Sequence, residues 1–447
     1  GMTGGSITNS GSIQQSYEGI SSNEAYGIYV GSTMDGASIT NSGLIAYNAD
    51  TFWNDVTFYG IYTSDLVNGS SILNSGTIRA DVSIRGDYDA SLYGIYTGSL
   101  TDSSVTNSGL IDLNVAATPG LSINTAYGIY VSGSLTNSQI TNSGTISLED
   151  FFVSEIDEVY GIYVSSSLTN SSVTNTGRIL ISGTATDDEA YGVGIETGSL
   201  NGTSMVTNSG LISFNFDTYS EGTAYGMYVG SISTDSVFSN TGTISLVGSD
   251  RSSSVTQYGM YASGTTDGSF LNSGTITMDA RAFGDAYVYQ YGMYQSGSVG
   301  ATGRLENSGT ISMNAVATGS SITQYGIYVT GNTDGSVVNS GTIRLKGSTN
   351  DSVDQYGIYT GSSAGGTIAN TGTISINGTG GDDSVDQYGI YTGSLSAGAA
   401  VSNSGTISLM GQARTDSAEG YGIYVSGSVD ASSVENSGTI TINQTSS

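Results

Sequence analysis

Tyrosines and carboxylates are the residues of this chain with the most potential for chemistry. Tyr-Gly phrases recur thirteen times, as in "AYGIYVGS" (25–32) and "QYGIYTGS" (355–362 and 387–394). An outward tyrosine ring can stack on a ligand, and its hydroxyl can form hydrogen bonds. The alternative is that neighbouring rings only stack on one another and cover the sheet. The candidate ligand-binding residues are the second tyrosines of these phrases: Tyr29, Tyr62, Tyr96, Tyr130, Tyr163, Tyr228, Tyr261, Tyr294, Tyr328, Tyr359, Tyr391 and Tyr424.

Acidic segments precede several of these phrases, as in "TATDDEAYG" (184–192), "STNDSVDQYG" (348–357) and "GTGGDDSVDQYG" (378–389). Carboxylates and loop carbonyls are the ligands that calcium prefers. The candidate calcium ligands are Asp187, Asp188, Asp351, Asp354, Asp382, Asp383 and Asp386. The equivalent segment "AVATGSSITQYG" (315–326) has no carboxylate, so we expect that no cofactor is required, and a solvated acidic ridge is the alternative to calcium.

Catalytic chemistry has few candidates because the chain contains no histidine and no cysteine. Ser-His and Cys-His pairs are therefore excluded, as are thiolate metal sites and disulfides. What remains are adjacent carboxylates (Asp187 with Asp188, Asp382 with Asp383) and two arginines, Arg79 and Arg344, as bases. Adjacent carboxylates in a loop are ordinarily solvated charge, so we predict that the chain is not an enzyme.

The charge of the chain restricts its partners. Thirty-eight acidic residues against nine basic ones give a net charge of −29, which argues against a nucleic-acid partner. No apolar run approaches the length of a membrane helix, so we expect no direct membrane insertion by this segment. Only 37% of the residues are apolar, but 31 tyrosines do not fit a disordered chain.

An internal repeat of 31 to 35 residues must position these side chains. An isoleucine follows each repeated asparagine by four positions, from Ile13 to Ile440, and an apolar residue precedes it by two. The asparagines, each followed by Ser or Thr and then Gly, are Asn9, Asn41, Asn74, Asn107, Asn142, Asn175, Asn208, Asn240, Asn272, Asn307, Asn339, Asn370, Asn403 and Asn436.

Each period predicts three short strands, as in 103–107, 144–148 and the "YGIYV" stretch, because apolar and polar residues alternate. We expect the Asn-Ser-Gly step to turn a corner through left-handed backbone. A variable loop of about ten residues is expected between the second and third strands. Glycine and β-branched residues oppose helices, and a propeller blade would need a longer period with four strands.

The predicted fold is an all-β, single-stranded parallel β-helix (β-solenoid) of about thirteen coils, forming one continuous domain over residues 1–447. Successive coils should stack the isoleucines in the interior and hydrogen-bond the asparagines from coil to coil. Alternation predicts that the first tyrosine of each phrase lies on the inner side and the second on the outer side. In "AYGVGIETGS" (190–199), Gly194 is expected at the outward tyrosine position, with a bulge.

The stretches "TNSGTISL" (141–148), "ENSGTISM" (306–313) and "SNSGTISL" (402–409) give the chain a family resemblance. It resembles the passenger regions of bacterial autotransporter adhesins and related right-handed parallel β-helices. The resemblance implies an exported rod displayed outside the cell on a Gram-negative outer membrane. The start "GMTGG" and the end "TINQTSS", in mid-pattern, are typical of a fragment of a longer surface protein.

Three functions follow as hypotheses. The first is a structural or adhesive extracellular rod that binds a glycan or protein on another cell or in a matrix through its repeated ladders. The second is a filament subunit that self-associates end to end. The third is a β-helix enzyme that acts on polysaccharides.

Overall fold

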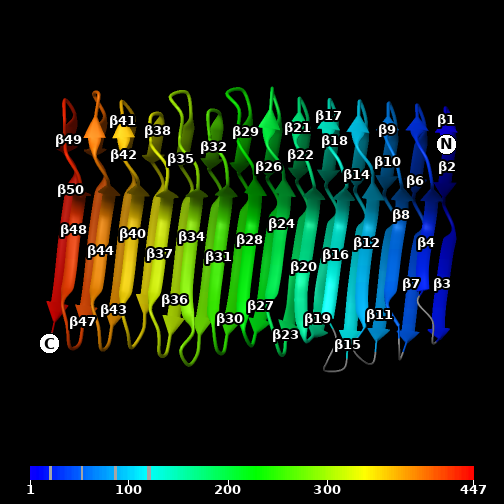
Figure 1. The fold of residues 1–447 in the computed structure, drawn as a ribbon, viewed down its shortest axis with the longest axis horizontal. Helices are drawn as coiled ribbons and strands as arrows, with labels where there is room; N and C mark the ends of the chain where they lie inside the picture. Colours follow the sequence, from blue (N-terminus) through cyan, green and yellow to red (C-terminus); the bar gives the residue numbers. More distant parts are fainter. Residues whose placement is uncertain (20–22, 52–53, 85–87, 118–121, 447) are drawn as a thin grey trace. The chain divides into compact units, whose positions relative to one another are not determined.

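The computed structural model describes residues 1–19, 23–51, 54–84, 88–117 and 122–446. These residues form a parallel β-solenoid of about thirteen coils with three sheets per coil, which confirms the predicted fold (Figure 1). In this part of the chain no helix is long and apolar enough to cross a membrane. The structure divides into two compact units, Gly1–Gly226 (unit 1) and Met227–Ser447 (unit 2). The single domain over residues 1–447 stays a prediction.

In unit 1 three sheets repeat in each coil, and we name them after the residue column that each one carries. The Asn sheet holds β2 (Ser6–Asn9), β6 (Ser38–Asn41), β10 (Ser71–Asn74), β14 (Ser104–Asn107), β18 (Gln139–Asn142), β22 (Ser172–Asn175) and β26 (Met205–Asn208). The Ile sheet holds β3 (Ser12–Gly19), β7 (Leu44–Thr51), β11 (Thr77–Ile84), β15 (Leu110–Ala117), β19 (Thr145–Val153), β23 (Arg178–Ala185) and β27 (Leu211–Thr218). The Tyr sheet holds β4 (Asn23–Val30), β8 (Val56–Thr63), β12 (Asp89–Thr97), β16 (Ser122–Val131), β20 (Glu155–Val164) and β24 (Ala190–Thr197), and β28 (Glu221–Val229) contains the unit boundary.

Unit 2 repeats the same three sheets. Its Asn sheet holds β29 (Val237–Asn240), β32 (Ser269–Asn272), β35 (Arg304–Asn307), β38 (Ser336–Asn339), β42 (Thr367–Asn370), β46 (Ala400–Asn403) and β49 (Ser433–Asn436). Its Ile sheet holds β30 (Thr243–Asp250), β33 (Thr275–Ala282), β36 (Thr310–Ala317), β39 (Thr342–Ser348), β43 (Thr373–Gly380), β47 (Thr406–Ala413) and β50 (Thr439–Ser446). Its Tyr sheet holds β31 (Ser254–Ala262), β34 (Tyr287–Gln295), β37 (Ile322–Val329), β40 (Val353–Thr360), β44 (Val385–Thr392) and β48 (Ala418–Val425).

Both predicted internal columns are confirmed. Parallel register places Ile78 beside Ile111, and the isoleucines between the two terminal coils are buried, each contributing about 1.5–3 kcal/mol by its burial. The asparagine amides form chains in which each Nδ2 donates to the Oδ1 of the next coil, at 2.8 Å for Asn9 to Asn41 and 2.7 Å for Asn74 to Asn107. In unit 2 the chain from Asn240 continues to Asn436. These bonds satisfy amides that would be costly to bury alone.

The predicted corner conformation is wrong. The Asn and Gly of the Asn-Ser-Gly step do not have positive φ. Positive φ occurs at other turns, for example at Gly69, Asp102 and Asn137 in unit 1. The corner glycine is needed for space: a Cβ on Gly109 would clash with the backbone oxygen of Gly76 in the preceding coil.

The predicted long loop is also wrong, because the strands on both sides extend into it. The second strand was predicted at 144–148, but β19 continues to Val153. In unit 2 only residues 251–253 separate β30 from β31. Small inward residues such as Gly248 continue the alternation, and pairing with the next coil satisfies the backbone.

A fourth, two-residue strand was not predicted from the sequence. In unit 1 these strands are β1 (Met2–Thr3), β5 (Met34–Asp35), β9 (Val67–Asn68), β13 (Leu100–Thr101), β17 (Leu135–Thr136), β21 (Leu168–Thr169) and β25 (Leu200–Asn201). In unit 2 the pair is β41 (Ser363–Ala364) with β45 (Leu395–Ser396). An apolar residue such as Leu100 enters the core from this strand.

Candidate functional site: the tyrosine ladder and its break

The tyrosine phrase places both of its tyrosines on the outer face of the Tyr sheet. In β8, Phe58 is buried and Tyr59 is half-buried, then Gly60 and Ile61 are both buried, and Tyr62 is again half-buried. Two consecutive inward residues reverse the alternation, so the prediction of an inner first tyrosine is wrong. The second tyrosines face outward as predicted.

Glycine is required at the point where the alternation reverses. A Cβ on Gly357 would lie 2.5 Å from the backbone oxygen of Gly389 and 2.5 Å from Cγ2 of Ile374. The backbone of the next coil cannot move aside, so only glycine fits. We name the first and second tyrosines of the phrases the first and second tyrosine columns, and together the tyrosine ladder.

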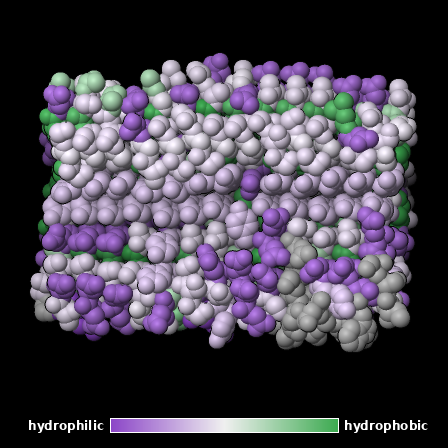
Figure 2. Space-filling view, in the orientation of Figure 1, coloured by the Kyte–Doolittle hydropathy of each residue, from purple (hydrophilic) through white to green (hydrophobic). Residues whose placement is uncertain are grey.

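In unit 1 the rings stack along both columns from Tyr26 to Tyr163. In unit 2 the first column stacks in the same way, whereas most neighbours in the second column are tilted or meet edge to face. In unit 1 the ring centroids of Tyr59 and Tyr93 are 4.8 Å apart at 11°, and those of Tyr62 and Tyr96 are 4.8 Å apart at 18°. The two columns also touch edge to face, as for Tyr26 and Tyr29 at 4.7 Å and 74°. Pale bands on the front face in Figure 2 follow this sheet.

This stacking limits what the ladder can bind. A ring inside a stacked column, such as the first column, has another ring on each face, so its edge and hydroxyl are what it presents to a partner. Stacking of a sugar on the ring faces is therefore blocked inside a continuous column. The predicted tyrosines are brought together in unit 1 (Tyr29, Tyr62, Tyr96, Tyr130, Tyr163) and in unit 2 (Tyr228, Tyr261, Tyr294, Tyr328, Tyr359, Tyr391, Tyr424).

Several phenols donate hydrogen bonds to carboxylates beside the ladder. Tyr127 donates to Oε2 of Glu158 at 2.7 Å, and Tyr421 donates to Oε2 of Glu419 at 2.7 Å. Tyr26 donates to Glu24. Burial, followed by the neighbouring phenols, raises the pKa of Tyr130 and of Tyr294 to about 12. The phenols therefore stay protonated and act as donors at neutral pH.

The ladder in unit 1 is broken at β24, in the coil that departs from the repeat. Parallel register places Val193 beside Tyr160 and Glu196 beside Tyr163. Gly194 therefore occupies the glycine position of the phrase, and the expectation that it replaces the outward tyrosine is wrong. The residue that replaces it is Glu196, and the signal in the sequence was "VGIE" in place of "YGIY".

Glu196 is poorly solvated at this break. Burial, followed by the charge of Glu158, raises its pKa to about 7. Its Oε2 atom is buried without a hydrogen-bond partner. A carboxyl group in this state gains from protonation, because desolvation penalises its charged form.

A pocket of about 310 Å³ opens beside the ladder break. Tyr191 lies between the first tyrosines of the two neighbouring coils, with its ring centroid 6.1 Å from that of Tyr160 and 5.8 Å from that of Tyr225. The pocket is lined by Asp157, Glu158, Tyr160, Glu189, Ala190, Tyr191, Glu221 and Thr223. Burial raises the pKa of Glu189, as do the charges of Glu221, Glu155 and Asp188. Carboxylates line this pocket without a basic residue among them.

The candidate calcium ligands do not converge on one site. Among the described residues, no group of three or more acidic side chains is arranged to hold a metal ion. Asp187 and Asp188 are exposed, and their backbone N–H groups both donate to the oxygen of Ser154. Asp382 and Asp383 are exposed on the turn before β44, whereas Asp351 accepts a hydrogen bond from Ser321.

Asp354 and Asp386 are the closest approach to a calcium site. They lie side by side in the paired strands β40 and β44. Burial, followed by the charges of Asp386 and Asp383, raises the pKa of Asp354 to about 6. Calcium binding by these carboxylates stays a prediction.

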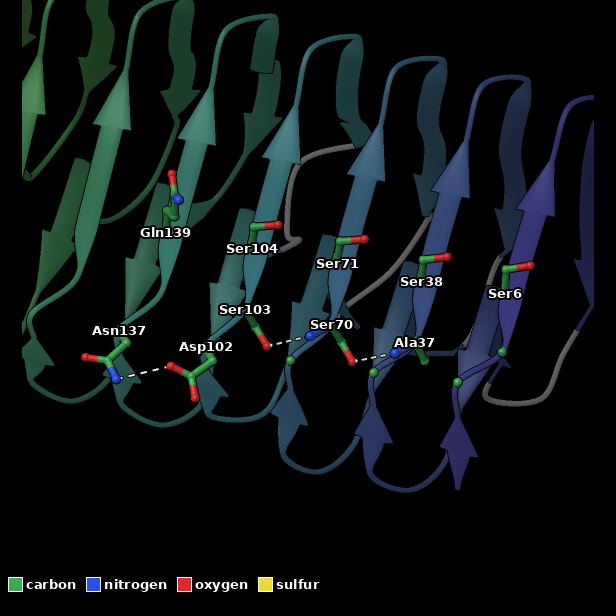
Figure 3. Close-up of a pocket in the computed structure, with 14 residues that line it drawn as sticks. Ser6, Ala37, Ser38, Ser70, Ser71, Asp102, Ser103, Ser104, Asn137 and Gln139 are labelled. Atoms are coloured by element: carbon green, nitrogen blue, oxygen red, sulfur yellow. Dashed lines mark hydrogen bonds between the residues drawn. The ribbon is translucent and has the colours of Figure 1, made fainter.

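A larger groove, of about 570 Å³, runs over the first coils of unit 1 (Figure 3). Two of its serines, Ser70 and Ser103, are used by the fold: the backbone N–H of Ala37 donates to Oγ of Ser70 at 2.9 Å. The N–H of Ser70 donates to Oγ of Ser103 at 3.0 Å, and Asn137 donates to Asp102 at 3.1 Å. These groups are already paired, so the groove is a weaker candidate than the pocket at the ladder break.

Of the two arginines considered as bases, Arg79 is held by acidic partners. Nε of Arg79 lies 2.7 Å from Oδ2 of Asp81 and 3.7 Å from Oδ2 of Asp112. The hydrogen bond and charge of Asp81 raise the pKa of Arg79. A base must lose its proton, and these partners hold it in place.

Comparison with known proteins gives one family match. Residues 102–234 match the model of the BigA third pectate lyase-like domain. The matched segment contains the whole ladder break, including Tyr160, Tyr191 and Glu196. Searches of curated proteins and of solved structures found no match to this chain.

Proposed function

We propose that this chain is an adhesin-type β-solenoid that acts outside a bacterial cell and binds its ligand at the ladder break. The observation that carries the proposal is the pocket lined by Tyr160 and Tyr191, where tilted ring contacts replace the parallel stacking of the first tyrosine column. BigA, whose domain model matches this segment, is an autotransporter-like adhesin. The repeated "NSGTI" stretches support the same class of surface protein.

The chemistry of the pocket favours a ligand that carries positive charge. Four carboxylates, Asp157, Glu158, Glu189 and Glu221, surround the two rings. A cation over an aromatic face gains about 0.5–2 kcal/mol, and nearby carboxylates add to that attraction. A glycan with free amino groups and a lysine-rich protein segment on another cell or matrix both have this chemistry.

Binding to two probes tests the proposal. Immobilised chitosan oligosaccharides and a lysine-rich peptide are titrated with the full chain, and with the Tyr191→Ala and Glu189→Gln variants. We expect one probe to bind, with an affinity that falls about tenfold in each variant and weakens with salt. The matched control is Asp382→Asn, which removes an exposed carboxylate of unit 2 and should leave binding unchanged.

Three outcomes contradict the proposal. Binding that survives both pocket variants would place the site elsewhere. If neither probe binds, the hypothesis that the ligand carries positive charge is wrong. Fibres that lengthen with protein concentration in electron micrographs would support the filament hypothesis in its place.

Polysaccharide cleavage is the second candidate, because the matching family model is named pectate lyase-like. The carboxylates of the pocket are the groups with raised pKa that could exchange a proton with a substrate. The full chain is incubated with acidic and neutral polysaccharides, and new reducing or unsaturated ends are measured. Product that is lost in Glu189→Gln would establish the enzyme and overturn the prediction of a non-enzyme.

A further inference from the structure

We propose that the tyrosine ladder is a site of oxidative coupling, at which one-electron oxidation joins tyrosines of adjacent coils as dityrosine. In unit 2 the ring centroids of Tyr359 and Tyr391 are 4.6 Å apart with an angle of 4°. Those of Tyr356 and Tyr388 are 4.8 Å apart with an angle of 3°. Parallel register holds each such pair permanently side by side, which gives coupling a high effective concentration.

Each ring of the ladder also contacts other tyrosine rings, so a ring that has lost an electron has a coupling partner next to it. Tyr356 contacts Tyr359 edge to face at 5.5 Å, so the two columns are connected as well as continuous. In unit 1, Tyr29 is 55% exposed and stacks on Tyr62 at 5.2 Å. An oxidant in solution can therefore reach one ring of a contiguous set, and the chain has no cysteine that would compete for oxidation.

Positioned carboxylates supply the second requirement, which is a proton acceptor. A phenol that loses an electron becomes a strong acid, and the proton must leave with the electron. Tyr421 already donates to Glu419, and Tyr127 already donates to Glu158, each at 2.7 Å. A carboxylate at this distance accepts the proton without diffusion of a base.

The reaction balances with hydrogen peroxide as the oxidant, used by a haem peroxidase. Each of two phenols loses one electron and one proton to give two phenoxyl radicals. The radicals form a C–C bond between ring carbons ortho to oxygen, and the two ring hydrogens then return to the oxygens. The two electrons and two protons reduce one hydrogen peroxide to two waters.

Such a bond would fasten neighbouring coils in a chain that has no disulfides. Tyr388 and Tyr421 are one coil apart, so the bond closes a loop of one repeat. A cross-link of this kind restricts the unfolded chain as a disulfide does. The proposal is independent of ligand binding at the ladder break.

The test uses the dilute full chain with a haem peroxidase and hydrogen peroxide. We expect dityrosine fluorescence without a change to dimer on a denaturing gel. Mass spectrometry of digests should locate the bonds between tyrosines of adjacent coils, such as Tyr359 with Tyr391. The folded chain should give about tenfold more dityrosine than the chain in urea. Bonds between different molecules, bonds between tyrosines far apart in the fold, or oxidation without coupling would overturn the proposal.

Variants at the pair Tyr388 and Tyr421 test whether coupling needs the phenol and the neighbouring carboxylate, and not only two adjacent rings. Tyr388→Phe keeps a ring in the stack but should abolish the bond to Tyr421. Glu419→Gln should lower that bond several-fold, and Glu419→Asp should restore part of it. The control Glu435→Gln removes an exposed carboxylate of β49 and should leave the yield unchanged. Equal yields in Glu419→Gln and the unmodified chain would refute the role of the carboxylate as proton acceptor.

Discussion

The residue immediately before the first tyrosine differs between the two units, although both units use the same coil. In unit 1 it is apolar and buried: Ala25, Phe58, Leu92, Ala126 and Val159. In unit 2 it is a buried glutamine in every coil but the last, which has Gly420: Gln257, Gln290, Gln324, Gln355 and Gln387. Each glutamine after Gln257 donates to the one in the preceding coil, at 2.8 Å for Gln290 to Gln257 and 2.6 Å for Gln355 to Gln324.

The facing layer of the Ile sheet differs in a matching way. Unit 1 has Val82 and Val115 at the position where unit 2 has Gly347 and Gly378. A Cβ on Gly378 would lie 2.8 Å from Oε1 of Gln355, so the small residue makes room for the amide. One coil can thus be filled by apolar packing or by an amide ladder, provided that both layers change together.

The outer faces differ as well. The ladder of unit 1 is broken at Val193 and Glu196, whereas the first column of unit 2 stacks without a break from Tyr258 to Tyr421. Unit 2 therefore combines an interior amide ladder with a continuous first tyrosine column, whereas unit 1 combines an apolar layer with an interrupted column. The stacked tyrosine rings stabilise the sheet, and the interruption of the stack in unit 1 creates the pocket that we propose as the binding site.

The largest expected effect comes from exchanging the interior of unit 1 for that of unit 2. Leu92→Gln buries an amide between Phe58 and Ala126, where no other amide can pair with it. Loss of packing and an unpaired polar group should lower the free energy of unfolding by about 4 kcal/mol. Hydrogen exchange measured on peptides around β12 tests this. Unchanged protection there would show that the interior of unit 1 tolerates an amide.

The two units should also respond differently to pH. The pKa of Glu196 is raised from 4.5 to about 7, so its stabilising contribution is complete below pH 4.5 and is lost as the pH rises through 7. The loss is at most about 3 kcal/mol, since each pKa unit corresponds to about 1.4 kcal/mol. For Asp354 the same loss falls between pH 3.8 and about 6. Hydrogen exchange against pH should show the first transition near β24 and the second near β40.

Two variants assign these transitions. Glu196→Gln should remove the transition near β24 and leave that near β40, and Asp354→Asn should do the reverse. Stability near β24 that rises between pH 4.5 and 7 would contradict the burial of Glu196.

Interrupting the amide ladder of unit 2 should have a smaller effect than adding an amide to unit 1. Gln355→Leu leaves the amides of Gln324 and Gln387 each without one partner, and should cost about 2 kcal/mol. The double variant with Gly378→Val copies the packing of unit 1 and is measured beside it by urea unfolding. A cost in the double variant that equals the sum of the two single costs would show that the two layers do not compensate.

The sequence was sufficient for the features that repeat with every coil. The isoleucine and asparagine columns and the stacking of outward tyrosines could be predicted because identical residues at a fixed period must pair in parallel register. The reversal of alternation at the glycine could not, because it depends on the clash between a Cβ and the backbone of the next coil. The ladder break was visible in the sequence as an irregular Tyr-Gly phrase. Its register with the neighbouring coil could not be predicted, because either Gly192 or Gly194 could occupy the position where a Cβ would clash with the backbone of the next coil.

The pocket itself was beyond sequence reasoning for a related reason. Glu158, Glu189 and Glu221 come from three successive coils, and their convergence depends on where the strands on each side begin. The aspartates chosen as calcium ligands lay in the most acidic segments, but four of them are on exposed turns, and only Asp354 and Asp386 lie side by side in paired strands. A high local density of acidic residues in the sequence did not indicate where carboxylates converge in the structure. The irregular phrase at the ladder break did indicate it.

The smallest expected effect on stability, and the most informative about function, comes from repairing the ladder of unit 1. Val193→Tyr with Glu196→Tyr restores both columns beside Tyr160 and Tyr163. The new ring contacts should raise the free energy of unfolding by about 1 kcal/mol, and the rings should close the pocket so that probe binding is lost. Val193→Ile with Glu196→Gln is the control, since it keeps the break and removes only the charge. If the variant with the repaired ladder still binds the probe, the pocket is not the binding site. If the variant is less stable than the unmodified chain, the break does not have room for two additional stacked tyrosines.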